Sequence, residues 1–185
     1  MIIDDPQAQF VMLFSSKTLY GNDPGAYIKY KGKRLTNKEY LEHWGKWIIL
    51  GEKENFEELA AILDPYVELG IIPCCKYDRF PLGEFSMTEC VMYVFCDDRE
   101  KDKISQILSS HGATTRAWVP ERDAIQGWGP GGVFLERWIE AHGYTGEVAE
   151  AIREDARRMI EETYGDEDAV CFGWKQGGGL ETELQ

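Results

Sequence analysis

The sequence predicts an α+β protein of two layers, a mainly antiparallel sheet with helices packed on one of its faces. Three observations lead to this prediction. Residues 46–119 follow the order strand, helix, strand, strand, helix, strand. The strand at 90–96 is apolar on both faces, which is typical of a central, covered strand. Hydrophobic residues make up 43% of the chain, enough for a core that needs neither metal nor disulfides.

The 185 residues are expected to form one domain over 1–176, followed by a flexible tail over 177–185. In the first third, residues 10–14 favour a strand. Two short runs at 27–30 and 33–35 flank Lys31-Gly32, a typical hairpin turn. Thr36 and Glu39 have the capping-box spacing that begins a helix, for which Gly45 is the candidate end.

The middle third carries the alternating order. Strands are expected at 46–50, 71–77, 90–96 and 114–119. Asn55 is the expected cap of the first helix, which breaks near Asp64-Pro65. Asp98 begins the second helix and Gly112 ends it.

Two further helices are predicted after a glycine-rich loop at 127–132. The first places five side chains on one face: Phe134, Leu135, Trp138, Ile139 and His142. The second covers 146–164, with apolar residues at helical spacing and charged pairs on the opposite face. Residues 169–174 are expected to return as a last strand.

Composition and charge exclude several classes of protein. The formal net charge is −13, so the field of the chain repels nucleic acid and a duplex-DNA binder is not expected. No apolar run approaches the roughly 18 residues of a membrane span, and the N-terminus has no signal-peptide pattern. We therefore expect a cytoplasmic protein without membrane contact. Five cysteines without a Cys-x-x-Cys pair predict free thiols, no metal site and no cofactor.

The hairpin is the first ligand-binding candidate. Four basic residues bring positive charge to an acidic chain, and two tyrosines interleave with them: Lys29, Lys31, Lys33 and Arg34, with Tyr27 and Tyr30. Stacking for a base and charge for a phosphate would suit a nucleotide or a phosphorylated small molecule. The alternative, which is favoured, is a charged edge hairpin whose lysines block sheet-to-sheet aggregation.

Two tryptophans and the glycine-rich loop add three candidate residues. Trp44 and Trp128 are expected at an element end and in a loop, where an exposed ring stacks on a ligand or partner. Gly131 precedes a helix, whose free backbone amides bind anions. The loop lacks the Gly-Lys-Ser/Thr of a phosphate loop, and the alternative is a flexible connection with one exposed tryptophan.

Gly45-Lys46-Trp47-Ile48-Ile49, followed by a helix, two strands, a second helix and the strand at 114–119, resembles the fold of the cap-binding translation initiation factor 4E. The resemblance is closest to the relatives grouped with the basophilic-leukemia-expressed protein, and it covers about residues 27–120. It implies a curved antiparallel sheet with helices on its convex face and a scaffold role for Trp47. The cap-stacking tryptophans of that family have no counterpart here, so no ligand residue carries over. The same order also fits a ferredoxin-like sandwich.

These features favour a non-catalytic module that binds a small ligand, a nucleotide or a phosphate group on the concave face of the sheet. One alternative is a protein-interaction or regulatory subunit that docks through exposed aromatic residues and the C-terminal helices. Another is an enzyme with a reactive thiol at Cys75, the cysteine closest to the polar residues Asp78 and Arg79. The three histidines lie near predicted helix ends, which accounts for them without catalysis. The sequence leaves open whether the chain is an enzyme.

Overall fold

The computed structural model describes residues 2–15, 19–22 and 25–171, without the side chains of Ile3 and of residues 19–22 and 25–30. Six strands form the main sheet, and each neighbouring pair is antiparallel. Their order across the sheet is β1 (Ile2–Ile3), β2 (Phe10–Phe14), β7 (Cys74–Asp78), β8 (Cys90–Asp97), β6 (Trp44–Gly51) and β9 (Thr115–Pro120). The predicted α+β class and the antiparallel sheet are therefore confirmed.

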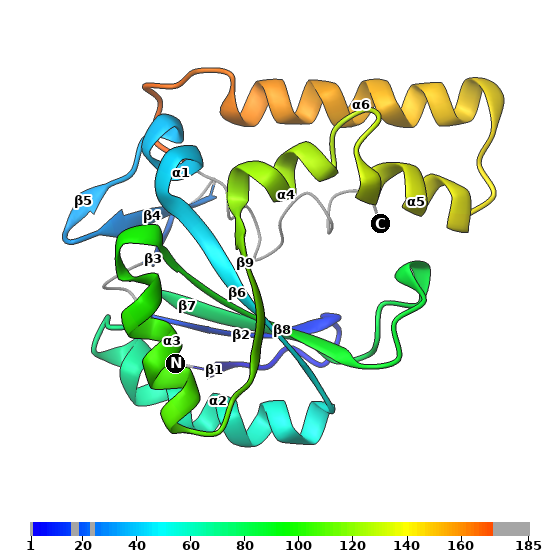
Figure 1. Cartoon of the computed structure of the whole chain (residues 1–185). Coiled ribbons are helices and arrows are strands. Elements are labelled where there is room, and N and C mark those ends of the chain that lie inside the picture. The colour runs from blue at the N-terminus through cyan, green and yellow to red at the C-terminus, as the bar shows by residue number, and fades with distance from the viewer. Residues whose placement is uncertain (1, 16–18, 23–24, 172–185) are drawn as a thin grey trace.

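Helices cover one face of this sheet, as predicted, and further helices lie beyond its other face (Figure 1). α2 (Lys53–Glu68) and α3 (Lys101–Ser110) cover one face. On the other side lie α1 (Asn37–His43), α4 (Glu121–Gly127), α5 (Val133–Ala141) and α6 (Gly146–Tyr164), with α6 outermost. Two short 3-10 turns are η1 (Gly83–Phe85) and η2 (Asp98–Glu100). Within the described ranges, no helix has both the length and the apolar character needed to cross a bilayer.

The centre of the sheet has the order that the sequence predicts. β6, α2, β7, β8, α3 and β9 follow one another along the chain, and β6 and β8 lie side by side between β7 and β9. This is the split βαβ arrangement of ferredoxin-like folds, extended by β2 and β1 beyond β7. All residues of β8 are buried, so the prediction of a central strand covered on both faces is confirmed.

A small second sheet contains the predicted hairpin. It consists of β3 (Leu19–Asn22), β4 (Gly25–Tyr30) and β5 (Lys33–Arg34). Lys31 and Gly32 have positive φ angles of 49° and 80°, as a two-residue hairpin turn requires. The predicted capping box is confirmed too, because the amide of Glu39 donates to Thr36 Oγ1 over 3.2 Å and the amide of Thr36 donates to Glu39 Oε2 over 3.1 Å.

The predicted start and the predicted end of α2 are both wrong. The helix begins at Lys53 rather than at an Asn55 cap, and it runs through Pro65 to Glu68. A proline costs one backbone hydrogen bond, but the turn that contains it buries Val67 completely in the core. Burial of such a side chain contributes about 1.5–3 kcal/mol, which offsets much of the loss.

Other predicted boundaries also change, because β7 begins at Cys74 rather than at 71 and α3 begins at Lys101 rather than at Asp98. α1 ends at His43, and Gly45 lies within β6. A Cβ at Gly45 would lie 2.4 Å from the Trp118 ring of β9, so the close approach of that side chain explains the glycine. Of the predicted last strand, Val170 forms a single bridge with Thr36. Residues 172–174 and the predicted tail lie outside the described ranges.

Candidate functional site

One face of the main sheet carries charged side chains in an apolar setting. Along β6, Trp47 packs towards the core under α2 and α3, and the neighbouring Lys46 points the other way. The strand register places Lys46 opposite Phe95 of β8, and Lys76 of β7 opposite Tyr93 of β8. We define the lysine face as Lys46, Lys76, Asp78, Tyr93 and Phe95 of the sheet with Glu121 of α4.

The two lysines of this face are nearly buried and lie over aromatic rings. Lys46 is 8% exposed and Lys76 is 7% exposed. Their Nζ atoms lie 5.4 Å and 5.3 Å from the ring centroid of Tyr93. Lys46 Nζ is also 5.5 Å from the Phe95 ring, and Lys76 Nζ is 4.8 Å from the Phe10 ring. Cation–π attraction acts at these distances and strengthens when the cation is desolvated.

Two carboxylates complete the lysine face. Glu121 places Oε1 3.1 Å from Lys46 Nζ, and its Oε2 accepts a hydrogen bond from Tyr40 Oη over 3.2 Å. Asp78 Oδ2 accepts a hydrogen bond from Tyr93 Oη over 3.3 Å. Burial, and then the charge of Glu121, raise the pKa of Tyr40 well above its ordinary value, so its hydroxyl remains a donor. The face thus holds two positive and two negative side chains.

Trp44 lies beside this face and is fully packed. It is 1% exposed, and its ring stacks on Tyr40 with 6.2 Å between centroids. Tyr40 stacks in turn on Tyr164 of α6 at 6.1 Å. Nε1 of Trp44 has no hydrogen-bond partner among the described residues. The prediction of an exposed ring is therefore wrong for Trp44, which belongs to the core between sheet and helices.

The glycine-rich loop at 127–132 is packed as closely as Trp44. Trp128 is buried, with the rings of Phe85 and Phe134 at centroid distances of 6.0 Å and 5.9 Å, so the prediction of an exposed ring is wrong here too. The amide of Gly131 donates a hydrogen bond over 3.0 Å to Glu136 Oε1. The anion position predicted at the start of α5 is thus taken by a carboxylate of the chain itself.

The hairpin candidates lie in another part of the molecule. In Figure 1, β4 and β5 are beside α1 on the left, and the α4–α5 connection is on the right of α4. Lys31 Nζ pairs with Glu100 of η2 at 3.2 Å, and Arg34 is exposed. The side chains of Tyr27 and Lys29 lie outside the described ones. Those predicted site residues whose side chains are described therefore do not form one site.

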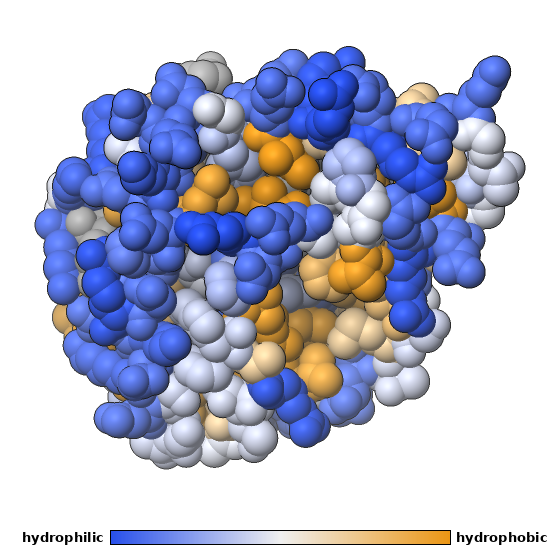
Figure 2. Space-filling view, turned by 45° about the horizontal axis from the view of Figure 1, so that its top comes forward, coloured by the Kyte–Doolittle hydropathy of each residue, from blue (hydrophilic) through white to orange (hydrophobic). Residues whose placement is uncertain are grey.

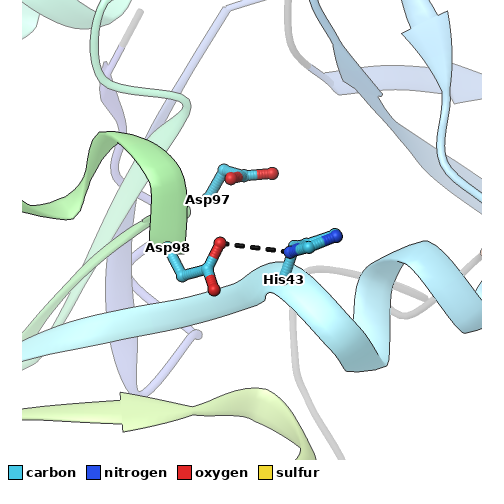
Figure 3. Close-up of side chains that lie close together, drawn as sticks. All are labelled: His43, Asp97 and Asp98. Atoms are coloured by element: carbon cyan, nitrogen blue, oxygen red, sulfur yellow. Dashed lines mark hydrogen bonds and ion pairs between the residues drawn. The ribbon is translucent and has the colours of Figure 1, made fainter.

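His43, Asp97 and Asp98 form a second polar group, with the kinds of atom that a divalent cation binds (Figure 3). One ligand atom of each lies within 4.8 Å of the others, and His43 Nδ1 faces Asp98 Oδ1 at 3.2 Å. Both oxygens of Asp97 accept hydrogen bonds from Arg99, at 2.7 Å and 2.6 Å. Although burial acts to raise the pKa of Asp97, these bonds hold it below its ordinary value. The ion pair with Arg99 accounts for Asp97, and we assign no metal to this group.

The cysteines are unsuited to nucleophilic chemistry. All five are free and buried. Burial, followed by the electrostatic interaction with Cys96, raises the pKa of Cys75 far above its ordinary value. Because the thiolate is the nucleophile, this environment disfavours the reactive-cysteine alternative.

Apolar surface lines a hollow on the side of the molecule seen in Figure 2, and hydrophilic surface surrounds it. Partly buried apolar residues pack against the cluster to which Tyr93 and Phe95 belong, among them Ile48, Leu50, Leu82 and Met87. Buried charge next to partly open apolar surface is the usual composition of a small-molecule site.

The residues of the lysine face were not predicted to form a site, although the sequence contains a signal for it. Lys46 and Lys76 each stand within a strand whose neighbouring residues are mostly apolar. Lysine is almost never fully buried unless it is paired, so its presence in the middle of a covered strand is informative.

Comparison of the chain with protein-family models, curated proteins and solved structures found no match. The resemblance to the initiation factor 4E fold therefore stays a prediction. The chemistry of the lysine face has to support any functional proposal on its own.

Proposed function

We propose that this chain is a non-catalytic binding protein for a small ligand with a phosphate group, such as a nucleotide, which it holds on the lysine face. The observation that carries this proposal is the near-complete burial of Lys46 and Lys76 over one tyrosine ring. Removing an ammonium group from water costs several kcal/mol, and apolar residues in such places are often as stabilising or more so. Because the fold gains little from lysines in this position, their presence supports a role in binding.

The side chains of this face suit a ligand with an anionic part and a ring. The two ammonium groups attract the anion, and the rings of Phe10, Tyr93 and Phe95 provide apolar area for the remainder. Charges in a poorly solvated site attract each other more strongly than charges at the surface. Because the whole chain carries a net charge of −13, its field favours a small ligand over a nucleic acid.

We also propose that the protein acts in the cytoplasm. Five cysteines that are all unpaired suit a reducing compartment, where thiols are kept from forming disulfides.

Titration calorimetry with phenyl phosphate and adenosine monophosphate tests the proposal, after a thermal-shift screen. A ligand at 100 times its Kd stabilises the fold by about 2.7 kcal/mol, which corresponds to roughly 5–10 °C for a chain of this length. Lys76→Met and Lys46→Met each remove one ammonium group at similar side-chain length. We expect each to weaken binding about 10- to 100-fold, because a hydrogen bond to a charged group contributes about 1.5–3 kcal/mol.

The matched control is Lys33→Met, at an exposed lysine of β5 that pairs with Glu39. Its affinity for both probes is expected to equal that of the unaltered chain, and circular dichroism checks that all variants fold. Equal affinity in the unaltered chain and in folded Lys76→Met would show that the lysine face is not the binding site.

A protein-docking role is the second candidate, and exposed apolar side chains on α5, on α6 and between them favour it. These are Val133, Tyr144 and Val148. Light scattering during size-exclusion chromatography measures the mass of the chain over a range of concentrations. A mass equal to that of a single chain at every concentration would exclude self-association as the docking role.

A further inference from the structure

Glu121 occupies the place where an anion would meet Lys46. It is buried, and its Oε1 lies 3.1 Å from Lys46 Nζ. This contact is short enough for an ion pair, but Oε1 accepts no well-oriented hydrogen bond from the described residues. Attraction between charges therefore holds this oxygen in place, and an anion from solution has to replace it at Lys46.

Glu121 is also the first residue of α4 and follows β9 without a loop. Pro120, the last residue of β9, is the N-cap of α4 and contributes no side-chain hydrogen bond to it. The contacts of Glu121 with Lys46 on β6 and with Tyr40 on α1 thus join the start of α4 to both elements. Displacement of one carboxylate would break both connections.

We propose that Glu121 is an internal competitor for the ligand anion, that it restricts the lysine face to dianionic phosphomonoesters, and that ligand binding releases the first turn of α4. This inference rests on the proposed function. A monocarboxylate ligand only exchanges one carboxylate for another at Lys46 and gains little attraction from charge. A phosphomonoester dianion brings a second charge, which the buried ammonium group of Lys76 attracts.

Calorimetric titrations with phenyl phosphate and benzoate, which share a ring and differ in charge, test the competition. We expect the unaltered chain to bind phenyl phosphate at least about tenfold more tightly than benzoate. Glu121→Gln keeps an acceptor for Tyr40 and removes the competing charge. In this variant both affinities are expected to rise by roughly 5- to 150-fold, the usual range for coupling between two binding events. The control is Glu136→Gln, which removes a carboxylate paired with Arg153 between α5 and α6 and is expected to leave both affinities unchanged.

Hydrogen exchange of the unaltered chain provides a second measurement that needs no variant. Saturation with phenyl phosphate is expected to accelerate amide exchange in α4 and to leave exchange in α2 unchanged.

Unchanged or weaker binding of phenyl phosphate to Glu121→Gln, or slower exchange in α4, would overturn the competitor role. The proposed function would still stand in that case if Lys76→Met weakens binding. Phenyl phosphate that binds neither the unaltered chain nor Glu121→Gln would overturn the proposed function, and this inference with it.

Discussion

Lys46 and Lys33 both pair with a glutamate, but in very different surroundings. Lys33 Nζ lies 2.6 Å from Glu39, and its side chain is 70% exposed, so water screens the pair. The side chains of Lys46 and Glu121 are each only 10% exposed. Loss of either partner there takes the ion-pair partner at 3.1 Å away from a buried charge, which is strongly destabilising. Removal of one partner is therefore expected to cost more stability in the buried Lys46–Glu121 pair than in the exposed Lys33–Glu39 pair.

We expect Lys46→Met to destabilise the fold by about 3–5 kcal/mol, the usual cost of breaking one side of a buried pair. Combination with Glu121→Gln is expected to recover most of this loss, because no uncompensated carboxylate then remains. Urea unfolding of both single variants and the double variant measures the coupling. Lys33→Met is the control, with a loss below about 1 kcal/mol. An equally small loss in Lys46→Met would contradict the role assigned to burial.

The identity of single site residues was the least predictable part of the molecule. Lys76 and Tyr93 are neighbours only because β7 and β8 pair with these residues opposite each other, and no local pattern in the sequence contains that register. Trp44 was expected to be exposed because it lies at the end of a helix. In the folded chain, however, α1 places Tyr40 over it, and Tyr164 of α6 stacks on Tyr40.

At the scale of elements, the long helix α6 was predicted well and the short helix α4 was missed. α6 was predicted over 146–164 and covers Gly146–Tyr164, because apolar residues repeat at helical spacing along its whole length. α4 has seven residues, with Ala124 and Ile125 as its buried hydrophobic side chains. A helix of two turns contains too few such positions to establish a period. Glu121 was missed for the same reason, since α4 positions it.

Glu136 connects α5 with α6. Its carboxylate accepts hydrogen bonds from Arg153 Nε at 2.8 Å and Nη2 at 2.5 Å, and from the amide of Gly131. The hydrogen bond from Arg153 lowers the pKa of Glu136 below its ordinary value of 4.5. A lowered pKa in the folded state means that this contact stabilises fully above about pH 4.5, and that the contribution is lost as the pH falls through the folded-state pKa.

We therefore expect Glu136→Gln to lower the free energy of unfolding at neutral pH, and this deficit to shrink at acid pH, as the pH falls below 4.5 through the folded-state pKa. Urea titrations at both pH values, followed by the fluorescence of the tryptophans near α5, measure this. Glu154→Gln removes a carboxylate that binds Arg157 within α6 itself, and serves as the control. A deficit of Glu136→Gln that is equally large at both pH values would argue against ionisation as its cause.

At the scale of the whole molecule, α1 meets a part of the chain that is far away in sequence. The side-chain Nδ2 of Asn37 donates to the carbonyl oxygens of Thr163 at 2.9 Å and Asp166 at 2.8 Å. The amide of Cys171 donates to the carbonyl oxygen of Leu35 at 2.9 Å. Asn37 and Cys171 are both buried. These contacts close the side of the sheet on which the lysine face lies.

We expect Asn37→Ala to destabilise the fold by about 1–3 kcal/mol, because it removes two part-buried hydrogen bonds that contribute about 0.5–1.5 kcal/mol each. Asn55→Ala is the matched control, since Asn55 is exposed on α2 and its replacement is expected to change stability by less than about 0.5 kcal/mol. Thermal and urea unfolding compare the two. Equal stability of both variants would show that the junction at α1 contributes nothing to the whole fold.

The α+β class was predictable because the hydrophobic pattern of the sequence indicates the order of strands and helices, and because β8 is apolar on both faces. The closure at α1, in which Asn37 binds Thr163 and Asp166, was not predictable, because these partners lie 126 and 129 residues further along the chain. Contacts at such separations depend on the packing of all elements between them and produce no periodic signal.

That closure also sets the sequence of events while the chain is being made. All six strands of the main sheet and both helices of its α2–α3 side lie within the first 120 residues, so this half can pack early. The contacts of Asn37 and Leu35 have to wait for residues 163–171. At the usual rate of about 5–20 residues per second, a nascent chain leaves α1 without these partners for several seconds. A chaperone that encounters the chain on the ribosome therefore reaches α1 before residues 163–171 do.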